Sequence, residues 1–474
     1  MSAQDASVTL RLAVSDAADR PSAPIVMTFI DEVARRSGGS VTLEPIWEAG
    51  GEDFEQGVAR MVVDGDADLG VAAGRAWDSV GITSFEALQA PFLIDNDALA
   101  RAVATSPVAD AMLAGMAGSG VAGLALWPED LRHPVALEPC SDPIVEPAQL
   151  AGRTVRAIGS SVTEDLLDTL GANHILGFDR SDVDACRVHA VESGLRQGQS
   201  LANLASRPTF TGDVVFFPKF QVLAANGVAF EHLSASQRQA ITEAALAARD
   251  QAIADHPSEV EAAAEWCAAG GRVVLAGPAG IAAFEQAAQP VFERIAADPV
   301  GAAAIESIRA LRETVEPAPG AQACEPQVRP SFAIPDTFAL PDTTGYSGEL
   351  PPDGTYRTGA TADELIAAGA DPDYAYRNDG IATVTYENGQ VTFVADDPNG
   401  TQRPCTADMT SQDGTFVRMV STSPSVCGLT FDFVWRVDGD DLFTIVVGSS
   451  ETGWSEQDFR NEWAWKDIPL TRIE

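Results

Sequence analysis

Positively charged side chains are scarce in this chain, so the few present are the first candidates for chemistry. The 474 residues include 30 basic and 69 acidic ones, for a formal net charge of −39. Only Lys219 and Lys466 are lysines, so arginine carries almost all of the positive charge. Such a surface repels nucleic acid and anionic lipid. An anionic ligand would have to be captured by local positive groups, and each inward-pointing arginine could therefore matter.

Sequence templates for catalysis, cofactors and metals fit poorly. Gly118–Gly123 matches the glycine pattern of dinucleotide-binding proteins, but a predicted helix precedes it and a strand follows, the reverse of what that site requires. We interpret it as a helix-to-strand turn. Asp64–Asp68 lacks the glycine and glutamate of a calcium loop, and we interpret it as a helix end and turn. The five histidines are dispersed and no hydrolase motif occurs, so we expect no enzyme, no metal and no cofactor.

The cysteines indicate the cellular compartment. The chain has six, none of them in a CxxC pair or at zinc spacing: Cys140, Cys186, Cys267, Cys324, Cys405 and Cys427. A scattered, even set predicts three disulfides and an oxidising, extracytoplasmic location, the alternative being free thiols in a cytosolic protein. We predict a Cys405–Cys427 bridge across one hairpin and leave the other pairings open. Met1–Asp5 shows no signal peptide, so export implies a leader absent from this chain.

The hydrophobic pattern up to residue 315 alternates strands with helices, which predicts a parallel α/β sheet. The predicted strands are Val8–Val14, Val41–Trp47, Ala67–Ala72, Val121–Leu126, Thr154–Ile158, Cys186–Ala190, Asp213–Ala225 and Val273–Leu275. The predicted helices are Ile25–Arg36, Phe54–Val63, Asp97–Thr105, Val108–Ala117, Ser161–Leu170, Ser234–Ala269, Pro278–Ala297 and Ala302–Val315. Pro257 predicts a kink or break near Asp255. No apolar run is long enough to span a membrane.

The pattern changes after residue 315. Residues 316–346, rich in Pro, Gly, Thr and Ala, are predicted to be a linker. Residues 347–474 read as a small antiparallel β barrel or sandwich. The predicted strands there are Gly354–Thr358, Ile381–Glu387, Gln390–Ala395, Thr415–Thr422, Leu429–Val437, Leu442–Val447 and Trp463–Trp465. Asn388-Gly389 predicts a tight hairpin, and Thr361–Ala368 a capped helix.

Six short stretches carry a recognisable pattern in order: Ser37–Val41, Val63–Gly70, Ala87–Ile94, Leu150–Arg156, Val188–Gly194 and Thr211–Pro218. Together they resemble the substrate-binding proteins of TRAP (tripartite ATP-independent periplasmic) transporters. The resemblance stops before residues 326–474. A receptor with such an added β domain resembles solute-binding proteins of Gram-positive actinobacteria, which implies a lipid-anchored lipoprotein.

The resemblance implies a periplasmic-binding-protein-like fold within residues 1–315, with two interleaved α/β lobes that close on a ligand by hinge motion. The lobes would be roughly residues 1–125 with 210–250, and 126–209 with 251–315. Ser234–Ala269 would be the long lobe-spanning helix.

The resemblance also implies which residues bind the ligand. Arg156 lies at the position of an arginine that clamps a carboxylate through two parallel hydrogen bonds, and Arg132 would assist. The alternative is that each pairs with an internal acid. Trp77 and Trp127 would line the cleft, or else pack in the core. The full predicted set of ligand-binding residues is Arg156, Arg132, Trp77, Trp127, Glu192, Asp213 and Phe216.

We therefore expect an exported, non-enzymatic receptor that binds a small organic anion between its lobes and delivers it to integral-membrane permease subunits. The alternative is a cell-surface ligand-sensing or binding module without a transport role. His189 and Ala190 replace an Asp-Gly pair of the resembled pattern, which puts a simple dicarboxylate ligand in doubt. The partner of the C-terminal β domain stays open.

Overall fold

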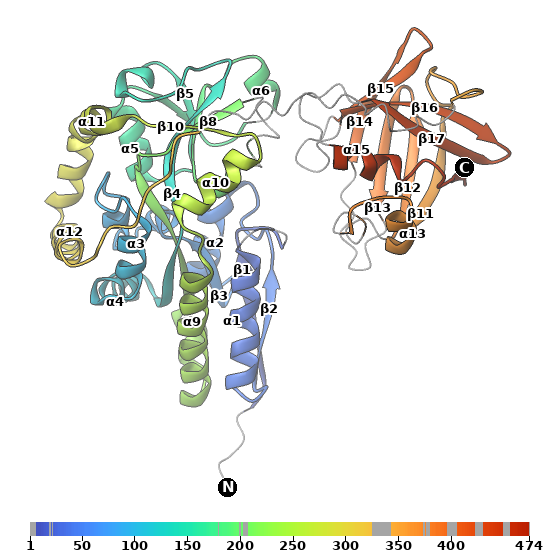
Figure 1. The fold of residues 1–474 in the computed structure, drawn as a ribbon. Helices are drawn as coiled ribbons and strands as arrows, with labels where there is room; N and C mark the ends of the chain where they lie inside the picture. Colours follow the sequence, from blue (N-terminus) through green and yellow to red (C-terminus); the bar gives the residue numbers. More distant parts are fainter. Residues whose placement is uncertain are drawn as a thin grey trace. The chain divides into compact units, whose positions relative to one another are not determined.

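The chain folds into two compact units, Met1–Pro326 and Gln327–Glu474. The structure is a computed structural model, and it describes residues 6–18, 20, 22–178, 180–198, 201, 207–324, 343–372, 375, 380–395, 405–421, 430–448 and 456–473 (Figure 1). The boundary between the units falls within residues 316–346, the predicted linker.

The first half of the N-terminal sheet has the strand order β2-β1-β3-β9-β4. Strands β1 (Val8–Val14), β2 (Val41–Ile46) and β3 (Leu69–Ala73) are parallel, and β9 (Phe217–Asn226) runs antiparallel to β3 and β4. Helices α1 (Ala23–Arg36) and α9 (Ala235–Asp255) lie side by side, and their apolar side chains share one core cluster with residues of these strands (Figure 1). Valines of α2 (Phe54–Asp64) pack in a second cluster.

Strand β4 (Val121–Glu138) joins this half of the sheet to the second half. Its residues up to Arg132 pair with β9, whereas from His133 onward they pair with β7 (Ala190–Ser193) and β8 (Arg207–Thr211). The second half also contains β5 (Thr154–Arg156), β6 (Asn173–Ile175) and β10 (Arg272–Val274). The prediction ended β4 at Leu126, because the polar and proline residues that follow do not read as a strand. Their partners on both sides keep them in the sheet.

The long helical region predicted over Ser234–Ala269 is two helices, α9 and α10 (Glu259–Ala268), separated at residues 256–258. The predicted break at Pro257 is confirmed. Trp266 of α10 packs on Phe210 and Val273, so α10 covers the second half of the sheet while α9 covers the first. The other helices in the described part of this unit are α3 (Asp97–Ala104), α4 (Pro107–Ala114), α5 (Ser161–Thr169), α6 (Arg180–Asp184), α8 (Gly227–Glu231), α11 (Gly277–Ala297) and α12 (Pro299–Arg312). Short 3₁₀ turns lie at Gly51–Asp53, Gly74–Val80, Glu86–Gln89, Gly115–Ser119, Pro147–Gln149 and Leu195–Gln197.

Two glycine-containing motifs are turns, as predicted. Gly65 ends α2 with a φ of 79°, in the left-handed region that glycine adopts readily. Gly120, with a φ of 71°, follows a 3₁₀ turn and leads into β4. The strand predicted at Cys186–Ala190 is wrong, because β7 begins only at Ala190 and Cys186 has a φ of 51°.

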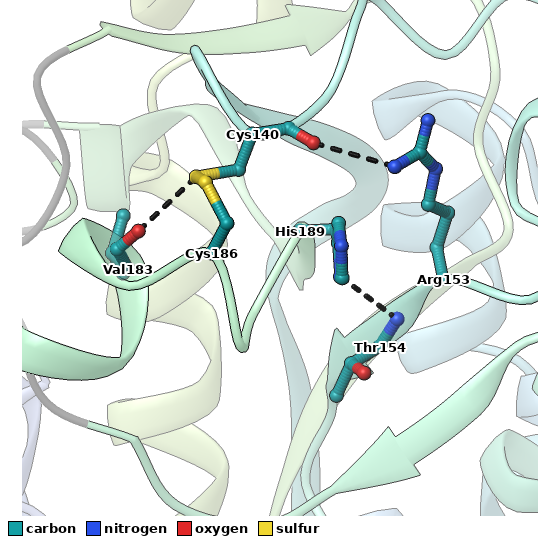
Figure 2. The surroundings of a disulfide bond; sticks show 6 residues. All are labelled: Cys140, Arg153, Thr154, Val183, Cys186 and His189. Atoms are coloured by element: carbon teal, nitrogen blue, oxygen red, sulfur yellow. Dashed lines mark hydrogen bonds between the residues drawn. A yellow bond between two sulfur atoms is a disulfide. The ribbon is translucent and has the colours of Figure 1, made fainter.

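Two disulfides hold the second half of this unit, Cys140–Cys186 and Cys267–Cys324. Figure 2 shows the first, with Arg153 donating a hydrogen bond to the Cys140 carbonyl oxygen. The nearby His189 accepts a hydrogen bond from the Thr154 backbone N–H through Nδ1 at 3.2 Å, so this residue serves the packing of β5. The predicted Cys405–Cys427 bridge involves Cys427, which lies outside the described residues.

The C-terminal unit contains a closed antiparallel barrel of the strands β11 to β18, in sequence order. Their bounds are Gly354–Ala360, Gly380–Glu387, Gln390–Ala395, Cys405–Gln412, Phe416–Ser421, Thr430–Asp438, Asp441–Gly448 and Leu470–Arg472. Apolar and aromatic side chains such as Val384, Tyr386 and Phe433 fill the interior. The barrel is therefore confirmed.

Local features of this unit test the finer predictions. The Asn388-Gly389 hairpin is confirmed, with φ values of 51° and 80° that suit such a turn. Helix α13 (Ala362–Ala367) carries the predicted capping box. The strand predicted at Trp463–Trp465 is wrong, because Trp463 ends helix α15 (Glu456–Trp463). Strands β14 and β18 were not predicted, since neither has a clear apolar alternation. Among the described residues of the whole chain, no helix combines the length and apolar character needed to cross a membrane.

Candidate functional site

A buried cluster of charges lies where the two halves of the N-terminal sheet meet. Glu192 of β7 is almost fully buried and receives two arginines. Arg132 donates from Nε to its carboxylate, and from Nη2 to Oε2 at 3.2 Å and to the backbone carbonyl at 2.8 Å. Arg75, just after β3, lies with Nη1 at 3.5 Å from Glu192 Oε1. One carboxylate thus ties together side chains from both halves of the sheet.

A second set of charges extends this cluster into the first half of the sheet. Arg75 Nε donates to Glu55 Oε2 at 3.0 Å, and Glu55 stands in the first turn of α2. Lys219 Nζ lies 3.1 Å from Glu55 Oε1 and 2.9 Å from Glu129 Oε1. Lys219 belongs to β9, every residue of which is buried, so its ammonium group reaches water only poorly.

The partners keep these groups ionised despite their burial. Burial alone would raise the pKa of Glu55, but Arg75 and Lys219 outweigh it and lower that pKa to about 2. Burial likewise opposes ionisation of Glu192, but Arg132 and Arg75 lower its pKa to about 2. Burial would lower the pKa values of Arg75 and Lys219, yet their acidic partners raise both above the ordinary values. At neutral pH the cluster is fully charged.

Arg156, at the end of β5, differs from the other two arginines. Its side chain is half-buried, and its Nε donates to the Leu176 carbonyl oxygen at 3.0 Å. In the part of the chain that the structure describes, no carboxylate lies within ion-pair distance of its guanidinium group. Its pKa is lowered, chiefly by burial, with Arg132 and Arg75 adding to the effect and Glu192 opposing it. Three guanidinium groups therefore face two carboxylates, Glu55 and Glu192.

Contacts between the halves close the space around this cluster. Gln56 of α2 donates to the Gly159 carbonyl oxygen, and Asp78 accepts from the Ser161 backbone N–H at 2.7 Å and from its hydroxyl at 2.9 Å. Ser160 donates to Gln89 at 2.9 Å. The cavity beside Arg75, Gln89 and Lys219 measures only about 10 Å³, the space of a single water.

The structure brings Arg132, Arg156 and Glu192 into one cluster and places the other four predicted residues differently. Trp77 is fully buried in the hydrophobic core. Trp127 packs in the cluster under α1 and α9. Phe216 packs edge-on against Phe92 and Phe284. Asp213 accepts hydrogen bonds from the backbone N–H groups of Ala276 and Gly277, at the start of α11.

A larger cavity of about 460 Å³ lies elsewhere in this unit, lined by residues from α3, α11, α12 and the segment up to Gly320. Most of its charged groups already have partners, and Glu285 adds a further carboxylate. Asp213 binds the start of α11, Arg312 pairs with Asp95, and Glu259 pairs with His133. An excess of carboxylates would repel an anion, so this cavity does not suit the expected ligand. In the described residues, no group of His, Cys, Asp and Glu side chains could hold a metal ion.

Four members of the cluster, Arg75, Glu55, Lys219 and Glu129, were missed from sequence. A signal existed for two of them. Lys219 is one of two lysines and stands inside the apolar run Phe216–Ala225, and Arg75 directly follows the apolar strand β3. A charged residue in such a setting needs a buried partner. The sequence around Glu55 and Glu129 gave no comparable signal.

Comparison with known proteins places this fold. The family described as "Bacterial extracellular solute-binding protein, family 7" (DctP) matches residues 14–175. A search of curated proteins found no match. The TRAP periplasmic solute-binding protein of Ralstonia eutropha H16, solved with bound (S)-2-acetolactate, has 19% identity and a TM-score of 0.56, covering 65% of this chain and 99% of its own.

Two further solved structures agree. The TRAP solute-binding protein of Xanthobacter autotrophicus Py2, with bound β-D-galacturonate, has 21% identity and a TM-score of 0.54, over 64% of this chain and 99% of that one. The sugar acid binding protein of Advenella mimigardefordensis, in complex with galactonate, has 19% identity and a TM-score of 0.56, over 65% and 99%. These matches confirm the resemblance and the fold seen from sequence. The matched family is described as one of solute-binding proteins.

Proposed function

We propose that the N-terminal unit is an extracytoplasmic receptor for a small solute that carries a carboxylate, and that it delivers this solute to a TRAP-type permease. Sugar acids are the first candidates. The fold, the family match and the carboxylate common to acetolactate, galacturonate and galactonate in the related structures support this proposal.

The observation that carries the proposal is the unmatched guanidinium group of Arg156. Arg132 and Arg75 are held by Glu192 and Glu55, whereas Arg156 has only a carbonyl partner among the described residues. A planar guanidinium group binds a carboxylate through two parallel hydrogen bonds. A solute carboxylate would supply the charged partner that Arg156 lacks, and the reduced exposure to water would strengthen the attraction.

The surrounding residues would supply orientation. Arg132 and Arg75 add positive potential without leaving their own carboxylates. Arg75 Nη2 is buried and has no hydrogen-bond partner within the described part of the chain, so it is a further donor that a solute oxygen could use. Gln56, Asp78 and Gln89, which now join the two halves, offer amide and carboxylate groups to hydroxyls. The predicted roles of Trp77, Trp127, Phe216 and Asp213 remain a proposal, and their packing favours support over direct contact.

Binding would require the two halves to separate. The cavity lined by Arg75, Gln89 and Lys219 holds about 10 Å³, far below the roughly 300 Å³ or more that ligand sites occupy, and contacts such as Asp78–Ser161 join the two halves. We therefore infer that the described arrangement is closed, and that a solute enters when contacts such as Asp78–Ser161 break.

The experiment compares D-galacturonate with D-galactose, which has the same ring without the carboxylate. Thermal unfolding and titration calorimetry of the full chain should show stabilisation by the acid, roughly 2.7 kcal/mol at a hundredfold excess over Kd, and none by the neutral sugar. Mass spectrometry of any solute retained on purification extends the test to other acids. Equal binding of both sugars, or a retained solute without an acid group, would contradict the proposal.

Delivery to a permease is tested separately. Cells that lack this protein should lose high-affinity uptake of the labelled solute, and unchanged uptake would favour the ligand-sensing alternative.

A further inference from the structure

Three segments of the chain pass between the two halves of the N-terminal sheet. Strand β4 changes partners between Arg132 and His133. The segment that precedes β9, around Val214, returns from β8 in the second half to β9 in the first. The junction of α9 and α10, at residues 256–258, is the third crossing. Any separation of the halves has to bend the chain at these three places.

One imidazole contacts all three segments. His133 belongs to β4 and is completely buried. Its Nδ1 lies 3.0 Å from the Val214 carbonyl oxygen, and its Nε2 lies 2.8 Å from Glu259 Oε2, at the first residue of α10. The Phe210 ring of β8 packs edge-on against it.

Both partners of His133 are hydrogen-bond acceptors. A neutral imidazole has a single N–H and can satisfy only one of them, whereas the doubly protonated ring donates to both. Burial by itself would lower the pKa of His133, but the Glu259 carboxylate and the Val214 carbonyl outweigh it and raise that pKa, and Arg132 acts weakly in the opposite direction.

The same joint is anchored to α3. The Glu259 backbone N–H donates to Asp97 Oδ2 at 2.8 Å, and His256 Nε2 lies 3.5 Å from Asp97 Oδ1. Arg101 of α3 donates to the His256 carbonyl oxygen at 3.1 Å. Among the described residues, Glu259 and Arg132 are the charged groups that act on the imidazole, and Asp97 and His256 hold the start of α10 beside it. If opening bends the chain at these three crossings, Glu259 or Val214 shifts relative to β4, and at least one contact of His133 lengthens.

We infer that protonated His133 fastens the three crossing segments in the closed arrangement, so that the receptor closes on its solute more firmly at low pH than at high pH. The inference rests on the proposed function, which it extends to a pH-dependent release. Because the pKa of His133 is raised above the ordinary 6.5, the fastening is complete below that value and is lost as the pH rises through the raised pKa.

Calorimetry with D-galacturonate from pH 5.5 to 8.5 tests the inference. If closure raises the pKa of His133 by about one unit, affinity should fall about tenfold over this range. His133→Gln and Glu259→Gln should each flatten the profile, and the control His232→Gln, at an exposed histidine, should keep it. A flat profile in the wild type, with galacturonate still bound, would overturn the inference and leave the proposed function standing.

A second readout needs neither ligand nor a change at His133 or Glu259. Spin labels on cysteines introduced at Thr42 of β2 and Thr169 of α5, both exposed, report the separation of the halves in the full chain. We expect the wider distances to gain population as the pH rises from 5.5 to 8.5. A distance distribution that does not change with pH would refute the fastening, whether or not galacturonate binds.

Discussion

The interiors of the two units differ in what they bury. The N-terminal unit buries Glu55, Arg75 and Glu192, and the described interior of the barrel is apolar and aromatic. The barrel's clearest ion pair, Arg418–Asp432, leaves the arginine side chain 36% exposed. Removing an ion from water costs several kcal/mol, which its partners must offset. A fold that retains such a cluster is the place to look for ligand chemistry, and a filled barrel is not.

Removing one buried carboxylate should have the largest effect. Glu192→Ala leaves Arg132 and Arg75 buried without their shared partner, so we expect a loss of about 3–5 kcal/mol in the free energy of unfolding of the N-terminal unit. The matched change in the barrel, Asp432→Ala, should cost about 1 kcal/mol or less, since Arg418 can turn to water. Urea unfolding of the full-length variants measures both. Equal losses of stability for Glu192→Ala and Asp432→Ala would contradict the difference between the two interiors.

A large cavity in the barrel should leave the receptor intact. Phe433→Ala removes a buried ring from the barrel core and should destabilise that unit by roughly 3–5 kcal/mol. We expect the full chain to unfold in two transitions, of which only one shifts. Solute affinity at 25 °C should not change. A variant that lost both barrel stability and solute binding would show that the units depend on each other.

Acid should weaken the N-terminal unit more than the barrel. Glu55 and Glu192 have pKa values lowered to about 2, so their contribution to stability is complete above their unfolded values near 4.5 and is lost as the pH falls towards 2. We expect the melting temperature of that unit to drop steeply below pH 4.5, by the equivalent of about 2 kcal/mol for each of the two carboxylates by pH 3. Calorimetric melts from pH 6 to pH 3 test this. Parallel curves for the two transitions would contradict it.

Local interactions should be alike in both units, which gives the smallest expected effects. Ser234 begins α9 and Thr361 begins α13, each with a capping box. Alanine at either position should cost about 1 kcal/mol, because one backbone N–H loses its acceptor. The two changes, each measured by the shift of its own unit's transition, should agree within a few tenths. If one alanine substitution cost more than twice as much stability as the other, part of the difference between the two units would arise outside the charged cluster.

The elements that depend on neighbouring residues could be predicted from the sequence, whereas the buried charged cluster, which depends on distant residues, largely could not. Periodicity and Pro257 located most helices and strands, because these depend on neighbours in the chain. Arg132 and Arg156 were found through the resemblance to TRAP substrate-binding proteins, whose pattern has an arginine after one strand and another within the next. The meeting of Arg75 with Glu55 depends on α2 returning over β3, and the pairing of Arg132 with Glu192 depends on how β4 crosses to β7. Contacts between residues so far apart in the chain follow no regular sequence spacing, so they could not be predicted from the sequence. The helical turn of Trp463 was misread because a short aromatic run also resembles a strand.

Arg156 offers the most direct test of the anion receptor. Calorimetry of Arg156→Ala and Arg156→Lys with D-galacturonate, beside thermal melts of the same samples, separates binding from folding. We predict that alanine leaves the melting temperature nearly unchanged and costs about 2–5 kcal/mol of binding free energy, or roughly 30-fold to several-thousand-fold in affinity. Lysine should recover little, since an ammonium group lacks the two parallel donors. Near-native affinity together with a much lower melting temperature would contradict the account, because Arg156 would then be a structural residue.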